Sequence, residues 1–379
     1  MSSNTALFNL LQAYSALKHP RLLSFPSHLS FPQVHHFVLS SILLNPHLLQ
    51  YPPAHTYQLS FWKWVIERLE ILLGDEEDDE IDQRLYDRLL SLVAISKPAV
   101  HGAILPPPPS FVTHYWKADP QSGPPIPTHA ISPIEHRSVT LFESRTTIEN
   151  GTTGLRTWGA SFVLAQVLIR NPILLANKSV LELGSGSGFL GLIVADIQVC
   201  HGGSTGSSVL YLTDVNEDAL RRCHENTQLP CNASSQHGNL FVRSLGWSDA
   251  LAEDRVRDLD IFMDNVGPDL VLGADTLYHP DMIAPFLTTL NIALHASKSP
   301  AGGVAYLALT VRNVDLLNTF IFALANHNLS AEELPNINPD NNISFVVQSE
   351  GTDQEVRVFK VVLRSRLQRN LLYNSTMAD

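Results

Sequence analysis

The chain has 379 residues, of which 44% are hydrophobic and 16% charged, so it holds enough apolar material for two folded domains. This composition excludes a mainly disordered protein. Lys and Arg number 25 and Asp and Glu number 37, which gives a formal net charge of −12 at pH 7. Because proteins that bind nucleic acid through its phosphates usually have a basic excess, direct nucleic-acid binding is not expected. An acidic chain is a more natural partner for a basic protein surface.

Cysteine usage and hydropathy predict the compartment. The three cysteines, Cys200, Cys223 and Cys231, form no CxxC pair, and an odd count does not suit a disulfide framework. The chain does not open with a basic region followed by a compact apolar run, and it has no stretch of ~18 apolar residues. We therefore expect a soluble, cytoplasmic protein with reduced thiols and no membrane contact. Separately, we expect a monomer without a metal site.

The N-terminal third is predicted to be helical. Apolar residues recur at helical spacing in runs that start at Leu7, Val34 and Phe61, and a further helix fits residues 82–95. Prolines separate these runs, so we assign residues 1–105 to an all-helical domain. Residues 106–135 are rich in proline and are predicted to be a linker.

Strands and helices alternate after this linker, which predicts a mostly parallel α/β sheet over residues 136–366, followed by a polar tail at 367–379. A first strand at 139–142 is expected to lead into this domain. The other elements are expected as follows: strands at 179–183, 209–213, 240–244, 269–273 and 304–309, and helices at 158–169, 188–199, 217–227, 283–296 and 314–325. Two last strands, 343–347 and 356–363, are expected to pair antiparallel.

A glycine-rich turn follows the predicted strand at 179–183, in the sequence VLELGSGSG at 180–188. Glycine is needed where the backbone turns with positive φ and where a ligand approaches the main chain closely. The start of the next helix offers free N–H groups that suit a carboxylate or a phosphate. Gly186, Gly188 and Gly191 also match the dinucleotide fingerprint, so the glycines alone do not separate a dehydrogenase from a methyltransferase.

Two acidic residues favour the methyltransferase. Glu182 precedes Gly184 by two residues, where it could meet the ammonium group of a methionine moiety but would repel a pyrophosphate. Asp214 ends the next strand, a position that suits an acceptor for two ribose hydroxyls. Taken singly, Glu182 could be a surface acid and Asp214 a helix cap. Both together, at the ends of adjacent strands, favour a cofactor site.

Further candidate residues stand beside later strands and the first helix of this region. Trp247 follows the third strand and could pack on an adenine ring or in the core. Ala274, Asp275 and Tyr278 follow the fourth strand, at the edge where open α/β sheets bind ligands. Asp275 could orient an acceptor amine, or cap the next helix, while Tyr278 could line the acceptor channel or pack on the sheet. Trp158 ends a polar, glycine-rich segment that either closes over the cofactor or only starts a helix.

These motifs together resemble the family 16 group of lysine methyltransferases, and within it the elongation factor 2 lysine methyltransferases. The resemblance rests on segments 151–158, 180–188 and 274–278, with an Asp-x-x-Tyr motif at Asp275–Tyr278. It implies a seven-strand, Rossmann-like class I methyltransferase sheet with its last strand antiparallel, and elongation factor 2 as the protein substrate. It also implies catalysis by Asp275 and Tyr278 and binding of S-adenosyl-L-methionine by Trp158, Glu182, Gly184, Gly186, Gly188, Asp214, Trp247 and Ala274.

Other functions stay open. The fold also permits methylation of another protein, a nucleic acid or a small molecule, although no Asn/Asp-Pro-Pro-aromatic motif follows the fourth strand. A nicotinamide oxidoreductase is weakened by Glu182. A catalytically dead scaffold would predict damaged glycines or a lost Asp214, and neither occurs. We therefore predict protein-lysine methylation, with the helical domain helping to select the protein substrate.

Overall fold

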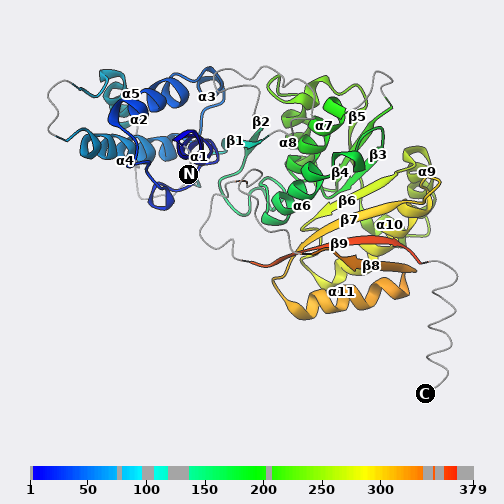
Figure 1. Cartoon of the computed structure of the whole chain (residues 1–379). Helices are drawn as coiled ribbons and strands as arrows, with labels where there is room; N and C mark the ends of the chain where they lie inside the picture. Colours follow the sequence, from blue (N-terminus) through cyan, green and yellow to red (C-terminus); the bar gives the residue numbers. More distant parts are fainter. Residues whose placement is uncertain are drawn as a thin grey trace. The chain divides into compact units, whose positions relative to one another are not determined.

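The computed structural model describes residues 3–74, 79–95, 106–117, 136–201, 207–335, 345 and 354–364 (Figure 1). Its contacts divide the chain into two compact units, Met1–Arg156 with Asn341–Thr352, and Thr157–Asp340 with Asp353–Asp379. Residues 136–156, which we expected to begin the second domain, thus belong to the first unit. Among the helices of the described ranges, none has the length and apolar character needed to span a membrane.

Helices form most of the first unit, as predicted. Its helices are α1 (Ser3–Ser15), α2 (Phe31–Phe37), α3 (Pro46–Gln50), α4 (His55–Leu73) and α5 (Gln83–Ile95), with a short 3₁₀ helix η1 (Pro20–Leu22) and a π-helical segment η2 (Val38–Leu43). One apolar stripe of each long helix enters a common core, where Val34, Phe61 and Leu69 are fully buried.

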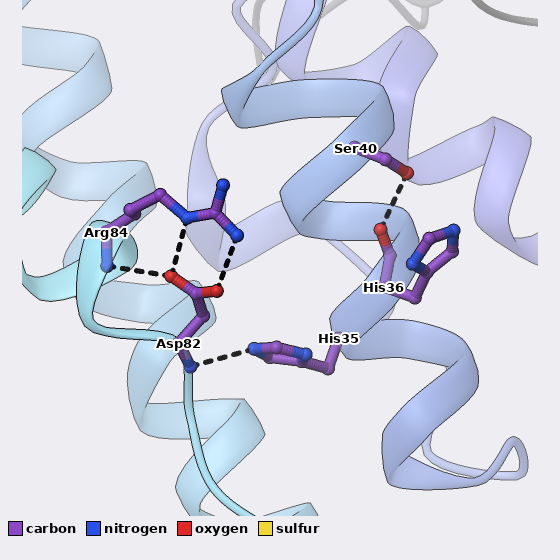
Figure 2. A network of polar contacts seen from close by, with 5 residues as sticks. All are labelled: His35, His36, Ser40, Asp82 and Arg84. Carbon is purple, nitrogen blue, oxygen red and sulfur yellow. Dashed lines mark hydrogen bonds and ion pairs between the residues drawn. The ribbon is translucent and has the colours of Figure 1, made fainter.

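A polar network links α2 to the start of α5 (Figure 2). The Asp82 carboxylate accepts a hydrogen bond from the backbone N–H of Arg84 at 2.9 Å and pairs with the guanidinium of Arg84 at 2.6 Å. The backbone N–H of Asp82 donates to Nε2 of His35 at 3.0 Å. Partial burial lowers the pKa of His35, which keeps the ring neutral and able to accept this bond near pH 7. The network therefore fixes where α5 begins relative to α2.

The predicted linker contains a strand. β1 (Ser110–Lys117) pairs antiparallel with β2 (His136–Glu143), from Ser110 opposite Glu143 to Lys117 opposite His136. Its sequence, SFVTHYWK, is rich in the aromatic and β-branched residues that favour strands, a signal that the neighbouring prolines hide. The linker assignment is therefore wrong for β1. The strand expected at 139–142 exists, but it belongs to this separate two-stranded sheet and does not lead into the large one. Residues 106–109 precede β1 without regular secondary structure, and residues 118–135 lie outside the described residues.

The second unit holds the predicted seven-strand sheet. Its strands are β3 (Ser179–Leu183), β4 (Val209–Asp214), β5 (Leu240–Ser244), β6 (Leu270–Ala274), β7 (Val304–Thr310), β8 (Leu329–Glu333) and β9 (Val356–Leu363). They lie in the order β5-β4-β3-β6-β7-β9-β8. β9 runs antiparallel to both its neighbours, and the other pairs are parallel. The Rossmann-like sheet with an antiparallel last strand is confirmed.

Helices cover both faces of this sheet, which explains its apolar strands (Figure 1). The five predicted helices are present as α6 (Gly159–Arg170), α7 (Phe189–His201), α8 (Glu217–Thr227), α10 (Ile283–His295) and α11 (Val314–Asn326), and α9 (Val256–Val266) was not predicted. α9, α10 and α11 contribute Leu259, Phe286 and Phe320 to one buried core. α7 packs very closely on the sheet, since a Cβ atom on Gly191 would lie 2.4 Å from a methyl carbon of Leu212.

The pairing expected for the last two strands is wrong. β9 lies between β7 and β8, so it has no edge left for a strand at 343–347. Of those residues only Phe345 is described, and it is buried in the first unit, near the rings of His114 and Trp116. β8 was missed because its sequence, LSAEE, is polar and lies at an edge of the sheet. The tail at 367–379 lies outside the described residues.

The strand order marks one edge of the sheet as a candidate ligand site. From β3 the chain proceeds outward through β4 to β5, and then returns to add β6 and β7 on the other side of β3. Open α/β sheets bind ligands beyond the carboxyl ends of the strands, at the point where this order reverses. The segments that follow β3, β4, β5 and β6 therefore surround one candidate site.

Candidate active site

The glycine-rich turn after β3 has the backbone conformation expected from its sequence. Gly184, Gly186 and Gly188 have φ values of 75°, 53° and 94°, in the region that favours glycine. The N–H groups of Gly184 and Ser185 both donate to the carbonyl oxygen of Thr213, at 2.9 and 2.8 Å. These bonds tie the turn to the end of β4 and hold its main chain where a ligand can approach it.

Asp214, at the end of β4, lies within hydrogen-bond distance of this turn. Its Oδ2 accepts from the N–H of Gly186 at 3.1 Å, and its Oδ1 accepts from the N–H of Asn216 at 2.9 Å. Asn216, rather than Asp214, caps α8 by accepting from the N–H of Ala219 at 3.0 Å. Since a carboxylate offers about four acceptor positions, Asp214 can accept further hydrogen bonds from two hydroxyls.

Glu182 is a buried group within β3, and the surface-acid alternative is wrong. Only 3% of the residue is exposed, and its Oε2 lies beneath α7, 3.1 Å from where a Cβ of Gly191 would stand. Among the described residues this oxygen has no hydrogen-bond partner. Burial raises the pKa of Glu182 to about 8, while the Ser185 side chain opposes this rise and the charge of Asp214 adds to it. A cation nearby would favour the charged form again.

Trp247 is both a core aromatic and a wall of the site. It begins the 3₁₀ helix η5 (Trp247–Leu251) and packs edge-on against Phe286, with 4.9 Å between ring centroids. Its Cζ2 lies 3.4 Å from where a Cβ of Gly184 would stand, and Cγ2 of Thr276 lies 3.3 Å from the same point. Thr276 is 4% exposed, and its hydroxyl has no hydrogen-bond partner among the described residues. Gly184 therefore faces two side chains that follow other strands, Trp247 after β5 and Thr276 after β6.

Asp275 follows β6 and is held by an arginine that the sequence did not point to. Its carboxylate forms two hydrogen bonds with Arg312, Nη1 to Oδ1 at 3.0 Å and Nη2 to Oδ2 at 2.5 Å. The N–H of Thr310 donates to Oδ1 at 3.4 Å. Asp275 does not cap the following helical turn, η6 (Pro280–Met282), because the His279 side chain does so. The capping alternative for Asp275 is therefore wrong.

Trp158, Ala274 and Tyr278 are the remaining candidate residues of this unit. The guanidinium carbon of Arg312 is 5.3 Å from the ring centroid of Trp158, the residue that precedes α6. Trp158 thus lies on the same side of the site as Asp275. Ala274 ends β6 opposite Ala308 of β7. Tyr278 is 64% exposed, so it does not pack on the sheet.

Sequence reasoning missed Arg312, Thr276 and Thr310. The Thr310 hydroxyl, like that of Thr276, is buried without a hydrogen-bond partner among the described residues. Thr310 ends β7 and Arg312 follows it. Because open α/β sheets bind ligands beyond the carboxyl ends of their strands, the strand expected at 304–309 could have pointed to both residues. Polar atoms left unpaired at a sheet edge fit a polar ligand there.

The residues present fit S-adenosylmethionine. The positive-φ turn leaves the main chain open to a close ligand, the Glu182 carboxylate in the strand before that turn suits an ammonium group, and Asp214 suits ribose hydroxyls. Within the ranges that the structure describes, no group of three His, Cys, Asp or Glu residues could hold a metal ion.

Comparison with known proteins agrees with this geometry. The model of a lysine methyltransferase family matches residues 139–320. The Homo sapiens protein-lysine N-methyltransferase EEF2KMT is 31% identical over 305 residues, which cover 79% of this chain and 78% of that protein. The Chaetomium thermophilum protein-lysine N-methyltransferase EFM3 is 30% identical over 284 residues, 74% of this chain and 75% of that protein. The chain therefore belongs to this lysine methyltransferase family and is an S-adenosylmethionine-dependent protein-lysine N-methyltransferase.

Proposed function

We propose that this enzyme methylates a lysine of elongation factor 2. The observation that carries the proposal is the extent of similarity to the EEF2KMT proteins, which reaches 79% of this chain for the human relative. The family model, by contrast, matches only residues 139–320. Likeness over so much of the chain includes part of the helical unit, which cofactor binding does not require. The net charge of −12 also suits a basic protein surface.

Residues at the carboxyl ends of β3 to β6 would hold the cofactor. When bound, S-adenosylmethionine supplies an electrophilic methyl group on a sulfonium. Glu182 would pair with its ammonium group, and Asp214 would accept the two ribose hydroxyls. Trp247 would pack on the adenine ring beside Gly184. The complete set proposed for cofactor binding is Trp158, Glu182, Gly184, Gly186, Gly188, Asp214, Trp247 and Ala274.

Asp275 and Tyr278 are the residues proposed to act on the acceptor. A free lysine has a pKa of ~10.4 and is mostly protonated at neutral pH, whereas only the neutral amine has a lone pair to attack the methyl group. The two hydrogen bonds from Arg312 leave an acceptor position open on the Asp275 carboxylate. That position can orient one N–H of the amine. The exposed phenol of Tyr278 would line the lysine channel. Alignment of reactants can supply ~7–11 kcal/mol, so we assign these residues an orienting role.

Labelling identifies the acceptor directly. Lysate from cells that lack this enzyme is incubated with the purified enzyme and labelled S-adenosylmethionine, and the labelled band is analysed by mass spectrometry. We expect elongation factor 2 to gain methyl groups at one lysine, and lysate from parent cells to take up much less label. If elongation factor 2 carries the same lysine methylation in the deletion cells as in the parent, another protein is the acceptor.

The first unit is proposed to help select the protein substrate, because every residue proposed for the cofactor belongs to the second unit. We expect a variant that begins at Thr157 to bind S-adenosylmethionine within about twofold of the full chain, but to lose methylation of the protein acceptor. Calorimetric titration with the cofactor serves as the folding control. Full methylation by a cofactor-binding truncation would restrict the first unit to a structural role.

A further inference from the structure

Arg312 lies where three elements of the second unit meet. It follows β7, forms two hydrogen bonds with Asp275 at the end of β6, and stands over the ring of Trp158 at the start of α6. We propose that Arg312 is a positioning residue for methyl transfer, which compensates the charge of Asp275 so that the acceptor lysine is held as its neutral amine. This inference rests on the proposed role of Asp275 at the acceptor.

Charge compensation matters because of the chemistry of the acceptor. An uncompensated carboxylate near a lysine favours its ammonium form, which has no lone pair and cannot attack. An ion pair of one carboxylate with one guanidinium carries no net charge, and Asp275 and Arg312 form such a pair. The Asp275 side chain is 5% exposed and that of Arg312 is 34% exposed, so solvent screens this carboxylate little. The arginine is therefore the main source of compensation.

The geometry of the pair also limits what Asp275 can accept. The two N–H groups of Arg312 occupy one acceptor position on each oxygen, and the N–H of Thr310 approaches a third. A carboxylate has about four such positions, so one is left. A neutral amine needs a single acceptor to fix an N–H and can direct its lone pair elsewhere. An ammonium group, with three N–H donors to satisfy, fits this remaining position less well.

Other titratable groups on the surrounding elements must be considered in any pH measurement. They include Glu182 on β3, Tyr278 and His279 after β6, and Glu355 before β9, whose carbonyl oxygen accepts from the N–H of Val311. Their contributions are common to the parent and to variants at Arg312. A difference between pH profiles at saturating cofactor therefore reports the pairing of Asp275.

The test is the single-turnover rate of methyl transfer as a function of pH, with saturating S-adenosylmethionine and unmodified acceptor protein. For Arg312→Gln we expect the midpoint of the rate–pH curve to rise by about one unit, with a loss of about tenfold at neutral pH and partial recovery in alkali. Adding Asp275→Asn to Arg312→Gln removes the uncompensated carboxylate, so the midpoint should return near that of the parent. Arg312→Lys keeps the charge but loses the planar fork, and should lower the plateau without moving the midpoint.

Arg357→Gln is the matched control. Arg357 is also 34% exposed and pairs with Glu355 at 2.7 Å, so this variant removes an equally exposed cation of the same unit. It should leave the profile unchanged. An Arg312→Gln profile that is lower by the same factor at every pH would overturn the proposal, as would a double variant whose midpoint stays raised. If the parent does not methylate elongation factor 2, the proposed acceptor is wrong, and the same comparison is made on the protein that the labelling identifies.

Discussion

Asp214→Ala is expected to weaken S-adenosylmethionine binding by about 100-fold. Hydrogen bonds to a charged group contribute about 1.5–3 kcal/mol each, and about 2.7 kcal/mol corresponds to a 100-fold change in affinity. The variant would lose the proposed bonds to the ribose hydroxyls. It would also lose the acceptor that holds the Gly186 N–H at 3.1 Å, so the turn after β3 becomes less well fixed. Isothermal titration calorimetry measures the dissociation constant directly.

Asp218→Ala provides the matched control for this measurement. Asp218 lies on α8, four positions beyond Asp214, and pairs with Arg221 on the surface. Its removal changes the net charge equally but leaves the turn intact, so the affinity should stay within about twofold of the parent, as surface ion pairs contribute little. Equal affinity in a folded Asp214→Ala variant would remove Asp214 from the cofactor site.

Asp275→Ala is expected to slow methyl transfer by about 100-fold while it changes the affinity for S-adenosylmethionine by less than about twofold, because small misplacements of a reacting group can cost this much. The variant removes the acceptor proposed to orient the amine and leaves Arg312 without its carboxylate. Asp275 also has φ 57°, a conformation that alanine adopts less readily than Asp or Asn. Asp275→Asn therefore tests the charge with less disturbance of the backbone.

Single-turnover kinetics at saturating cofactor separates a role in methyl transfer from a role in binding. Asp281→Ala is the control, because Asp281 follows the same strand but its side chain is 88% exposed, and its rate should match the parent. We expect Tyr278→Phe to have a smaller effect than Asp275→Ala, since the phenol is exposed and the ring remains. A normal methyl-transfer rate in Asp275→Ala would leave that residue only a structural role.

The residues proposed for the cofactor and those proposed for the acceptor lie at the carboxyl edge of one sheet. Residues after β3 and β4, where Gly186 is bonded to Asp214, are among those proposed to bind the cofactor. Residues after β6 and β7, where Asp275 is bonded to Arg312, are those proposed to act on the acceptor. Thr276 lies between them, because its methyl carbon faces Gly184 while its chain neighbour is Asp275. Under the proposed assignment, a displacement on either side would alter the alignment of methyl group and amine.

Much of the fold follows from local pattern. Strands β3, β5 and β9 and helix α8 have the predicted bounds, and the other predicted elements of the second unit that are present lie within two residues of theirs. Their signals are local, because apolar runs, glycines and caps act within a few residues. Prediction failed for strands whose amino-acid composition, or that of their neighbours, is not typical of strands. β1 was missed because prolines neighbour it, and β8 was missed because its polar sequence is not typical of a strand.

By itself, the sequence determined the class of sheet, the glycine turn and the acidic residues at its strand ends, because each depends on neighbours along the chain. Only the tertiary structure showed that Glu182 is buried beneath α7 and that Asp275 is held by Arg312. Asp275 and Arg312 meet because β6 and β7 lie side by side in the sheet. Charge compensation of this kind depends on distance in space, and no local pattern of residues encodes that distance.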